Sequence, residues 1–194
     1  MGKLTGKIAL VTGASKGIGR GIALAFAREG ADLLLSARGE ESLASTAKEV
    51  AALGVRVEVQ AGDVGSEEDV NAMFAHWQQS FDRLDLLVNN AGAFNGGPLD
   101  ELATEDWDHV INTNLRGPFL CTRAAMQIMK RQGGGRIINI GSISAKRVRF
   151  NSAPYSASKH GLWGLTQVTA LEGRGHGITC GCLHPGNILT ERRD

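Results

Sequence analysis

The sequence predicts an α/β fold, in which a parallel β-sheet carries helices on both faces. Short apolar runs alternate with amphipathic helical patterns along the chain, which is the pattern of consecutive β–α–β units. Of the 194 residues, 42% are hydrophobic and 21% are charged, as in ordinary globular domains. Glycine departs from the average with 26 residues, and such an excess indicates tight turns or close backbone approaches. We expect a single domain that covers residues 1–194.

Six short apolar runs bounded by turn-forming residues are expected to be buried strands. Such nearly continuous apolar runs are typical of a sheet that is covered on both faces. In chain order the runs are residues 8–12, 31–36, 55–60, 84–89, 136–140 and 178–183.

Between the runs, apolar residues recur every three or four positions, which places them on one face of a helix. Pro154 suits the first turn of a long last helix that extends to Glu172. In the helix before it, Asn114 interrupts an apolar stripe that includes Trp107 and Leu115. The other stripes are Ile18, Ile22 and Phe26; Leu43, Ala47 and Val50; and Val70, Met73, Phe74, Trp77 and Phe81.

The nearly balanced charge argues against a protein that binds nucleic acid. Lys and Arg total 21 against 20 Asp and Glu, and no basic stripe is evident. No apolar stretch reaches the ~18 residues that a membrane span needs, and the first residues lack a signal-peptide core. We therefore expect a soluble, cytoplasmic protein without a nucleic-acid or membrane partner.

The three cysteines predict neither a disulfide framework nor a metal site. Cys180 and Cys182 flank one residue of an expected strand, so their side chains point to the same face. No set of Cys and His residues has zinc-like spacing. Small buried thiols in a reducing compartment are the simpler interpretation.

A glycine-rich loop, TGASKGIG at residues 12–19, joins the first strand to the first helix. Glycines let the backbone approach an anion closely, and the N–H groups at the helix N-terminus face that anion. A simple tight turn is the alternative, but the position between a strand and an amphipathic helix favours a dinucleotide pyrophosphate. The candidate binding residues here are Gly13, Ser15, Lys16, Gly17, Ile18 and Gly19.

The end of the second strand favours NADP over NAD. An acidic residue there binds the free 2′-hydroxyl of NAD, whereas an arginine accommodates the 2′-phosphate of NADP. Arg38 occupies this place with no acid before Glu40, and Lys16 supplies a second cation. The alternative is that both cations are simply solvated.

Tyr155, the single tyrosine, precedes Lys159 by one helical turn, so both lie on one helix face. An ammonium about 5 Å from a phenol favours the phenolate by roughly 3 kcal/mol at an effective dielectric of 20, which suits general acid–base chemistry. Such a pair is common by chance. However, Ser142 follows the fifth expected strand, at the carboxyl edge where ligands bind open parallel sheets. Asn114 is a polar group on an apolar face and needs partners.

Together, TGASKGIG, NNAG at residues 89–92, Asn114, Ser142, YSASK at residues 155–159 and Pro185-Gly186 resemble the short-chain dehydrogenase/reductase family, from residue 4 to the end of the chain. The resemblance implies a Rossmann-type sheet of order 3-2-1-4-5-6 and an oxidoreductase that interconverts a carbonyl and an alcohol. In this reading Tyr155 is the acid/base and Ser142 binds the substrate carbonyl. Lys159 binds the nicotinamide ribose and favours the Tyr155 phenolate, and Asn114 holds a water in a proton relay.

The resemblance also implies further contacts to NADP. Asp63 would contact adenine, Asn89 would order the loop beside the cofactor, and Ile188 and Thr190 would hold the carboxamide. The remaining expected binding residues are Val64, Ala91, Gly92, Pro185 and Gly186, with Arg38, Tyr155 and Lys159 as above.

One departure from the family concerns the C-terminal part. Family members usually continue beyond the Pro-Gly motif into a substrate-covering loop, a helix and a seventh strand, whereas this sequence stops at Asp194. Strand 178–183 would then be a sheet edge. A cofactor-binding sensor or scaffold with little turnover is therefore the alternative to an enzyme.

Two long helices carry more apolar residues than one sheet face can cover, and the family resemblance implies that they pair across a two-fold axis in a homodimer or homotetramer. The alternative is that these residues pack on their own sheet. They are Phe119, Met126, Met129, Leu162, Trp163, Leu165 and Val168.

Overall fold

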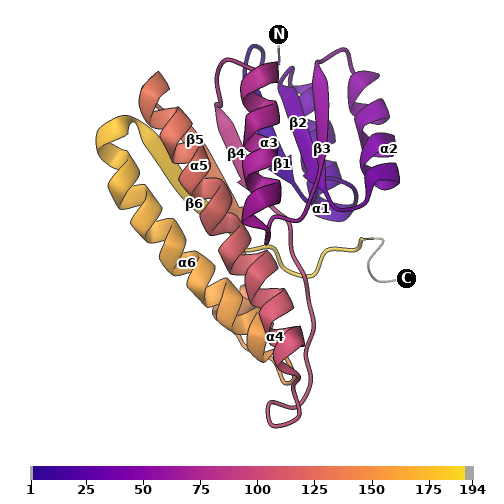
Figure 1. Ribbon diagram of the computed structural model, residues 1–194, viewed down its shortest axis with the longest axis vertical. Coiled ribbons are helices and arrows are strands. Elements are labelled where there is room, and N and C mark those ends of the chain that lie inside the picture. Colours follow the sequence, from indigo (N-terminus) through magenta and orange to yellow (C-terminus); the bar gives the residue numbers. More distant parts are fainter. Residues whose placement is uncertain (1, 191–194) are drawn as a thin grey trace.

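A central sheet of six parallel strands organises the computed structural model, which describes residues 2–190 (Figure 1). The strand order is β3-β2-β1-β4-β5-β6, which is the Rossmann-type arrangement and confirms the predicted fold class. The strands are β1 (Ile8–Thr12), β2 (Asp32–Ala37), β3 (Val57–Ala61), β4 (Leu86–Asn89), β5 (Gly135–Ile140) and β6 (Ile178–Leu183).

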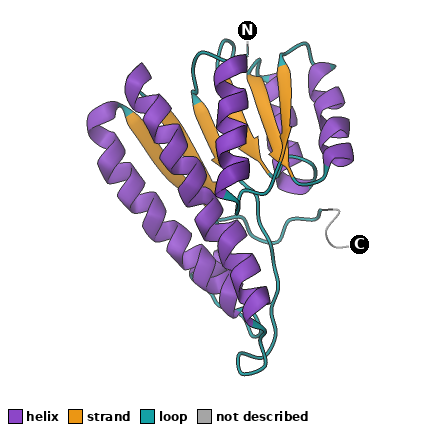
Figure 2. Cartoon of the chain, viewed as in Figure 1, coloured by secondary structure: helices purple, strands orange, loops and turns teal. Residues whose placement is uncertain are grey.

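Helices cover both faces of this sheet (Figure 2). Two of them, α1 and α2, pack on one face, while α3, α5 and α6 pack on the other. The helices are α1 (Gly17–Arg28), α2 (Glu40–Ala51), α3 (Glu67–Ser80), α4 (Thr104–Ile111), α5 (Gly117–Gln132) and α6 (Ala153–Gly173).

The central strand β1 contributes to both apolar layers, and all of its residues are buried. Side chains alternate between the two faces of a strand. Leu10 accordingly packs with Trp77 in one layer, and Val11 packs with Leu43 in the other. This double burial explains the unbroken apolar runs in the sequence.

The helix predicted around Trp107 is longer than its apolar pattern indicates. A π-helical turn, Asn112–Arg116, joins α4 directly to α5. Pro118 has no N–H to donate to the carbonyl of Asn114 four residues earlier, which is a physical reason for the departure from α-helical geometry. The turn places Asn114 inside the molecule.

An ion cluster around Asp85 joins the amino ends of β1 and β4. Arg83 contacts both carboxylate oxygens of Asp85 at 2.7 and 3.0 Å, and Lys7 lies 3.2 Å away. The N–H of Ile8 donates to the same carboxylate at 3.0 Å. Burial would raise the pKa of Asp85, but the hydrogen bonds from Arg83, Ile8 and Lys7 lower it below its ordinary value.

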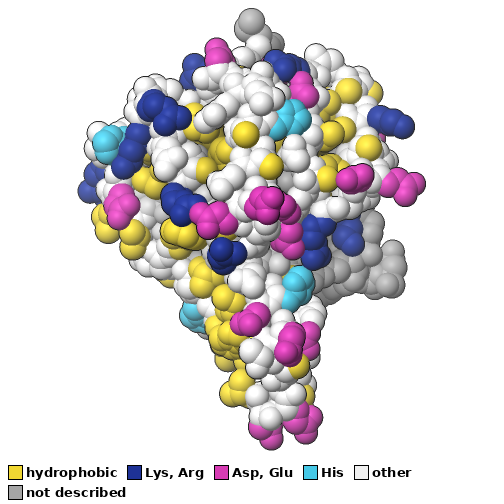
Figure 3. All heavy atoms as spheres, viewed as in Figure 1, with side chains coloured by type: hydrophobic (Ala, Val, Ile, Leu, Met, Phe, Trp, Pro, Cys, Tyr) yellow, Lys and Arg dark blue, Asp and Glu magenta, His cyan; other side chains and the backbone are white. Residues whose placement is uncertain are grey.

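The apolar residues expected at a helix–helix interface between copies differ in burial, and two of them, Met126 and Leu165, are partly buried. Met129 and Leu162 are fully buried in this chain. They pack on their own sheet, as the alternative interpretation of the sequence has it. Phe119, Trp163 and Val168 are exposed on α5 and α6, which lie side by side (Figure 1). Hydrophobic side chains also gather along this side of the molecule in Figure 3.

The other side chains of the surface carry both signs of charge. In the view of Figure 3, Lys and Arg are interspersed with Asp and Glu over the described surface. Within residues 2–190, no helix combines the length and the apolar content needed to cross a membrane.

Candidate active site

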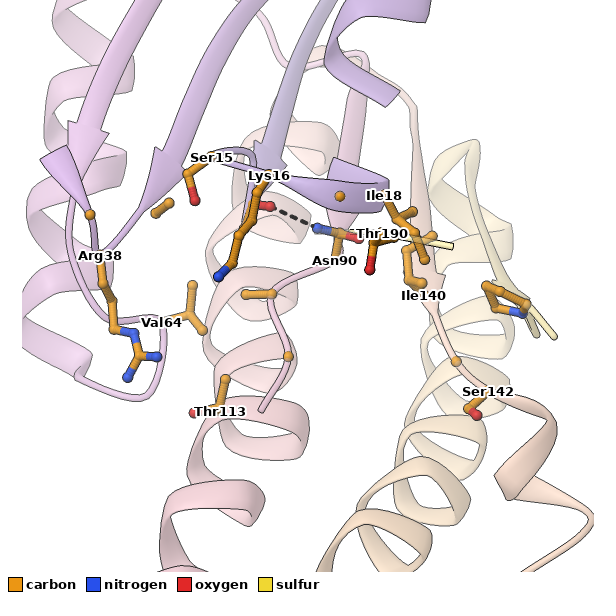
Figure 4. A pocket seen from close by; sticks show the side chains of 18 of the residues that line it. Ser15, Lys16, Ile18, Arg38, Val64, Asn90, Thr113, Ile140, Ser142 and Thr190 are labelled. Atoms are coloured by element: carbon orange, nitrogen blue, oxygen red, sulfur yellow. Dashed lines mark hydrogen bonds between the residues drawn. The ribbon is translucent and has the colours of Figure 1, made fainter. Parts of the chain in front are cut away.

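A cavity of about 530 Å³ opens at the carboxyl ends of the strands (Figure 4). It extends from the loop after β2 to the loop after β5, and the segment after β6 closes one side. Most predicted site residues line it: Gly13, Ser15, Lys16, Gly17, Ile18, Arg38, Asp63, Val64, Ala91, Gly92, Ser142, Tyr155, Lys159, Pro185, Gly186 and Thr190.

The glycine loop has the close contacts that its sequence predicts. Gly13 has a φ of +64°, and a Cβ at this position would lie 2.7 Å from the Cα of Ala91. A Cβ on Gly19 would collide with the carbonyl of Gly13 and the side chain of Asn90. Gly19 does not line the cavity; it allows α1 to pack against the loop that does.

Asn90 fastens this loop to the end of β4. Its Nδ2 donates to the carbonyls of Thr12 at 2.9 Å and Gly13 at 3.0 Å (Figure 4). The backbone N–H groups of Asn90 and Ala91 both donate to the Thr12 hydroxyl at 3.1 Å. Two adjacent strand ends are thereby held at a fixed separation beneath the cavity.

Asn89 lies elsewhere than the resemblance implies. Its side chain is buried on the α5 side of the sheet, where Nδ2 donates to Thr122 at 3.1 Å and to Asn139 at 2.8 Å. Neighbouring residues of a strand point to opposite faces. Asn90, not Asn89, therefore orders the loop beside the cavity.

The basic side chains Lys16 and Arg38 extend into the same end of the cavity, on either side of Val64 in the view of Figure 4. Arg38 is 62% exposed and lies 3.9 Å from the carboxylate of Asp63, a distance at the limit of an ion pair. Ser15, Gly39 and Ser42 complete this end of the cavity. The arrangement is open, basic and suited to a phosphate group.

Ser142 lies at the opposite end of the cavity, directly after β5. Its Oγ accepts a hydrogen bond from the N–H of Ser144 at 3.1 Å and so caps a short 3₁₀ turn, Ile143–Ala145. A hydroxyl has one donor and can accept twice. Accepting from Ser144 leaves the hydroxyl hydrogen of Ser142 to be donated to a ligand.

Tyr155 and Lys159 line the cavity from one face of α6, as their spacing predicts. The Lys159 Nζ lies 5.7 Å from the centre of the Tyr155 ring and donates to the carbonyl of Ile140 at 2.8 Å. Phe94 meets the Tyr155 ring edge-on, with 5.3 Å between the ring centres. Lys159 is only 4% exposed, so its charge lies inside the protein.

Asn114 does not line the cavity and is fully buried beneath it. Its Oδ1 accepts from the N–H of Ala93 at 2.7 Å, and its Nδ2 donates to the Ala93 carbonyl at 2.9 Å and to Ser158 at 3.2 Å. The side chain thus ties the loop after β4 to α6. Its neighbour Thr113 lines the cavity instead.

Ile188 is the remaining predicted residue that does not line the cavity, and its side chain is 45% exposed. The cavity also includes residues that were not singled out in the sequence. Five of these eight residues end a strand or directly follow one, and that position is the signal by which they could have been found. They are Ala37, Gly39, Ser42, Gly62, Asn90, Thr113, Ile140 and Gly141.

The three cysteine thiols have raised pKa values. Burial raises the pKa of Cys121 and of Cys180 to about 12. Burial also raises the pKa of Cys182, although the nearby charge of Lys159 opposes the shift. Among the described residues, no group of three or more His, Cys, Asp or Glu side chains is arranged to hold a metal ion.

Comparison with known proteins gives the site a family context. A sequence model of the family described as "short chain dehydrogenase" matches residues 7–194. The 3beta-hydroxysteroid dehydrogenase of Mediterraneibacter gnavus is 38% identical over 99% of this chain and 71% of its own length. The 3-oxoacyl-[acyl-carrier-protein] reductase of a Synechocystis species is 39% identical over 98% of this chain and 78% of its own.

Solved structures agree with the sequence comparison. The crystal structure of a short-chain type dehydrogenase/reductase from Mycobacterium marinum superimposes with a TM-score of 0.93 at 34% identity. The match covers 97% of this chain and 75% of that one.

Proposed function

The chain belongs to the short-chain dehydrogenase/reductase family of oxidoreductases, which act on alcohol and carbonyl groups, and we propose that it is an NADP(H)-dependent enzyme of this kind with Tyr155 as its acid/base. One observation carries the proposal. Ser142, Tyr155 and Lys159 line one end of a cavity whose other end holds the glycine loop and two cations.

The residues of the cavity fit a dinucleotide. Gly13 and Gly19 remove side chains where the backbone must turn and pack closely, and the loop leads into the N-terminus of α1. The N-cap residue is Lys16, whose ammonium can only donate hydrogen bonds and does not cap the helix. The positive end of the helix dipole is thus available to a pyrophosphate.

The 2′-phosphate of NADP would lie between Lys16 and Arg38. Both side chains reach the cavity, and a guanidinium can bind phosphate oxygens in a bidentate manner. Asp63 is the one carboxylate among the described residues that line the cavity. Its 3.9 Å separation from Arg38 leaves the guanidinium room to bind an anion.

Nicotinamide supplies the hydride chemistry when it is bound. The protein's own part is to orient the substrate and to move a proton. Ser142 would donate its hydroxyl hydrogen to the substrate oxygen, which stabilises the charge that develops there. Tyr155 would transfer its phenolic proton to the same oxygen during reduction and accept it back during oxidation.

Lys159 and Asn114 would support this proton transfer. The buried ammonium of Lys159 lies 5.7 Å from the centre of the Tyr155 ring, where it would bind the ribose of the nicotinamide. The side chain of Asn114 is already engaged with Ala93 and Ser158. Pro118 has no N–H to donate to the backbone carbonyl of Asn114. We therefore propose that this carbonyl binds the water of the proton relay.

A turnover screen tests this function. Ketones, aldehydes and secondary alcohols, including ethyl acetoacetate as a small 3-oxoacyl ester, are incubated with NADPH, NADH or their oxidised forms, and absorbance at the nicotinamide band is followed. We expect turnover of at least one carbonyl substrate with NADPH and slower turnover with NADH. Turnover with NADH but not with NADPH would contradict the cofactor assignment. If no substrate is turned over with either cofactor, the proposed catalytic activity is contradicted.

A further inference from the structure

His184 lies against the backbone of Ser142, although the chemistry above does not use it. The chain leaves β6 at Leu183 and continues past the end of β5. Two backbone hydrogen bonds join these segments, from the N–H of Gly141 to Leu183 at 2.7 Å and from the N–H of Ile143 to Pro185 at 3.3 Å. Ser142 lies between the two donors, and its own backbone faces the imidazole ring of His184.

The distances indicate which hydrogen bond the imidazole makes. The Nδ1 atom of His184 is 2.9 Å from the carbonyl oxygen of Ser142 and 3.3 Å from its nitrogen. The first distance is typical of an N–H···O bond and the second is longer than the usual range. A lone pair on Nδ1 would also repel the carbonyl oxygen, so the geometry favours the tautomer in which Nδ1 carries the hydrogen and donates it over the one in which Nδ1 accepts from the N–H of Ser142.

The imidazole ring is held in position on two sides. Gly141 makes room for it, because a Cβ at that residue would lie 2.7 Å from the Nδ1 of His184. Trp163 of α6 meets the ring edge-on, with 5.6 Å between the ring centres. A ring fixed in this way can hold the peptide of Ser142 in one orientation.

We propose that His184 is a positioning residue that fixes Ser142 through the Nδ1–H bond to its carbonyl oxygen. The inference rests on the proposed function, since it assigns His184 to the residue that binds the substrate oxygen. Ser142 is 9% exposed and its Oγ already contacts Ser144. Holding the backbone therefore fixes the direction in which the hydroxyl points into the cavity.

A double-mutant cycle separates positioning from general stabilisation. His184→Leu should lower kcat and kcat/KM together by about ten-fold or more, because a small misplacement of a catalytic group is costly. The dissociation constant for NADPH, measured by fluorescence titration, should change less than two-fold. In a Ser142→Ala background, the same His184→Leu change should lower kcat less than two-fold further.

Conservative and control variants sharpen the result. In His184→Asn, the amide nitrogen occupies the same place along the side chain as Nδ1 of histidine and can donate the same hydrogen bond. The kcat of this variant should therefore lie within about three-fold of the wild-type value. Gly141→Ala should also lower kcat, because its methyl group would displace the ring of His184 together with the side chain of Cys182. His176→Leu, at an exposed histidine in the 3₁₀ turn Arg174–His176 before β6, should leave kcat unchanged.

A second readout requires no turnover. Long-range ¹H–¹⁵N NMR correlations of the histidine rings in the wild-type protein should show His184 protonated at Nδ1, with its resonance assigned by comparison with His184→Asn. A neutral ring protonated only at Nε2 would overturn the inference, as would a full effect of His184→Leu in the Ser142→Ala background. If Ser142→Ala itself leaves turnover intact, the proposed function fails, and the NMR result still decides the contact.

Discussion

Two adjacent asparagines, Asn89 and Asn90, perform different tasks because a strand turns successive side chains to opposite faces. Asn90 bonds to the carbonyls of Thr12 and Gly13 and holds the glycine loop. Asn89 bonds to Thr122 and Asn139 inside the protein. A change at one residue should affect cofactor binding, and a change at the other should affect stability.

We predict opposite consequences for the two alanine variants. Asn90→Ala releases the glycine loop and should raise the dissociation constant for NADPH about ten-fold, with a small change in the free energy of unfolding. Asn89→Ala leaves buried partners unsatisfied and should lower the free energy of unfolding by about 1–3 kcal/mol, with NADPH affinity retained. Urea unfolding and fluorescence titration of both variants check this. Equal effects of the two substitutions on both quantities would contradict it.

Arg38 should decide the choice of cofactor. Its guanidinium is exposed at the end of the cavity that Lys16 also reaches. Arg38→Asp replaces a partner of the 2′-phosphate with a group that repels it and that can bind a 2′-hydroxyl. We expect NADPH to bind more tightly than NADH to the wild type and more weakly than NADH to the variant. Equal affinities for the two cofactors in the wild type would refute the assignment.

At the scale of elements, the carboxyl ends of the strands form the candidate site and the amino ends contribute to stability. The segments that follow all six strands contribute to the cavity, whereas the opposite ends of β1 and β4 hold the buried carboxylate Asp85. The cluster around Asp85 joins residues far apart in the sequence and contributes to stability.

This cluster predicts a pH dependence of stability. The pKa of Asp85 is lower in the folded protein than in the unfolded chain, so the carboxylate stabilises the fold above pH 3.8. That contribution is lost as the pH falls through the lowered pKa. Asp85→Asn should lower the free energy of unfolding by about 1 kcal/mol at pH 7, given the screening of half-exposed partners. The difference from the wild type should narrow below about pH 4; a constant difference down to pH 2.5 would contradict this account.

Most elements could be predicted because apolar periodicity and glycine positions are local properties. The predicted strand 8–12 matches β1, and the predicted strand 31–36 is shifted by one residue from β2. The π-helical turn could not be predicted from periodicity, because the apolar positions from Trp107 to Leu115 also have the spacing of a continuous α-helix. Pro118, four residues after Asn114, was the available signal.

The site was predictable as a set of strand-end residues, but the direction of each side chain was not. Spacing cannot tell which face of β4 Asn89 occupies, or that the Asn114 side chain turns toward Ala93 instead of the cavity. The contact between His184 and Ser142 is also beyond sequence reasoning, because it depends on how β6 aligns with β5.

At the scale of the whole molecule, the exposed apolar faces of α5 and α6 are where we expect two copies of the chain to associate, in a homodimer or as part of a homotetramer. Phe119, Trp163, Val168 and Leu171 are between 42% and 66% exposed, and large apolar patches of this kind mark interfaces. Family resemblance suggests a two-fold pairing of these helices.

Sedimentation velocity at micromolar concentration measures this association. We expect a species of about twice the 20.6 kDa chain mass, and Val168→Glu should shift it to the monomer because a charge is then placed inside the interface. Leu53→Glu, at an exposed leucine near the end of α2, should leave the dimer intact. A wild-type monomer as the single species would exclude the interface.

The central claim is that Tyr155 transfers the proton in a carbonyl–alcohol reaction, and turnover of the Tyr155→Phe variant tests it most directly. The substitution removes one hydroxyl group and keeps the ring that contacts Phe94. We expect kcat to fall by at least ~10²-fold, the lower range of acid–base assistance, while the dissociation constant for NADPH stays within two-fold. Turnover close to that of the wild type on the same substrate would contradict the claim.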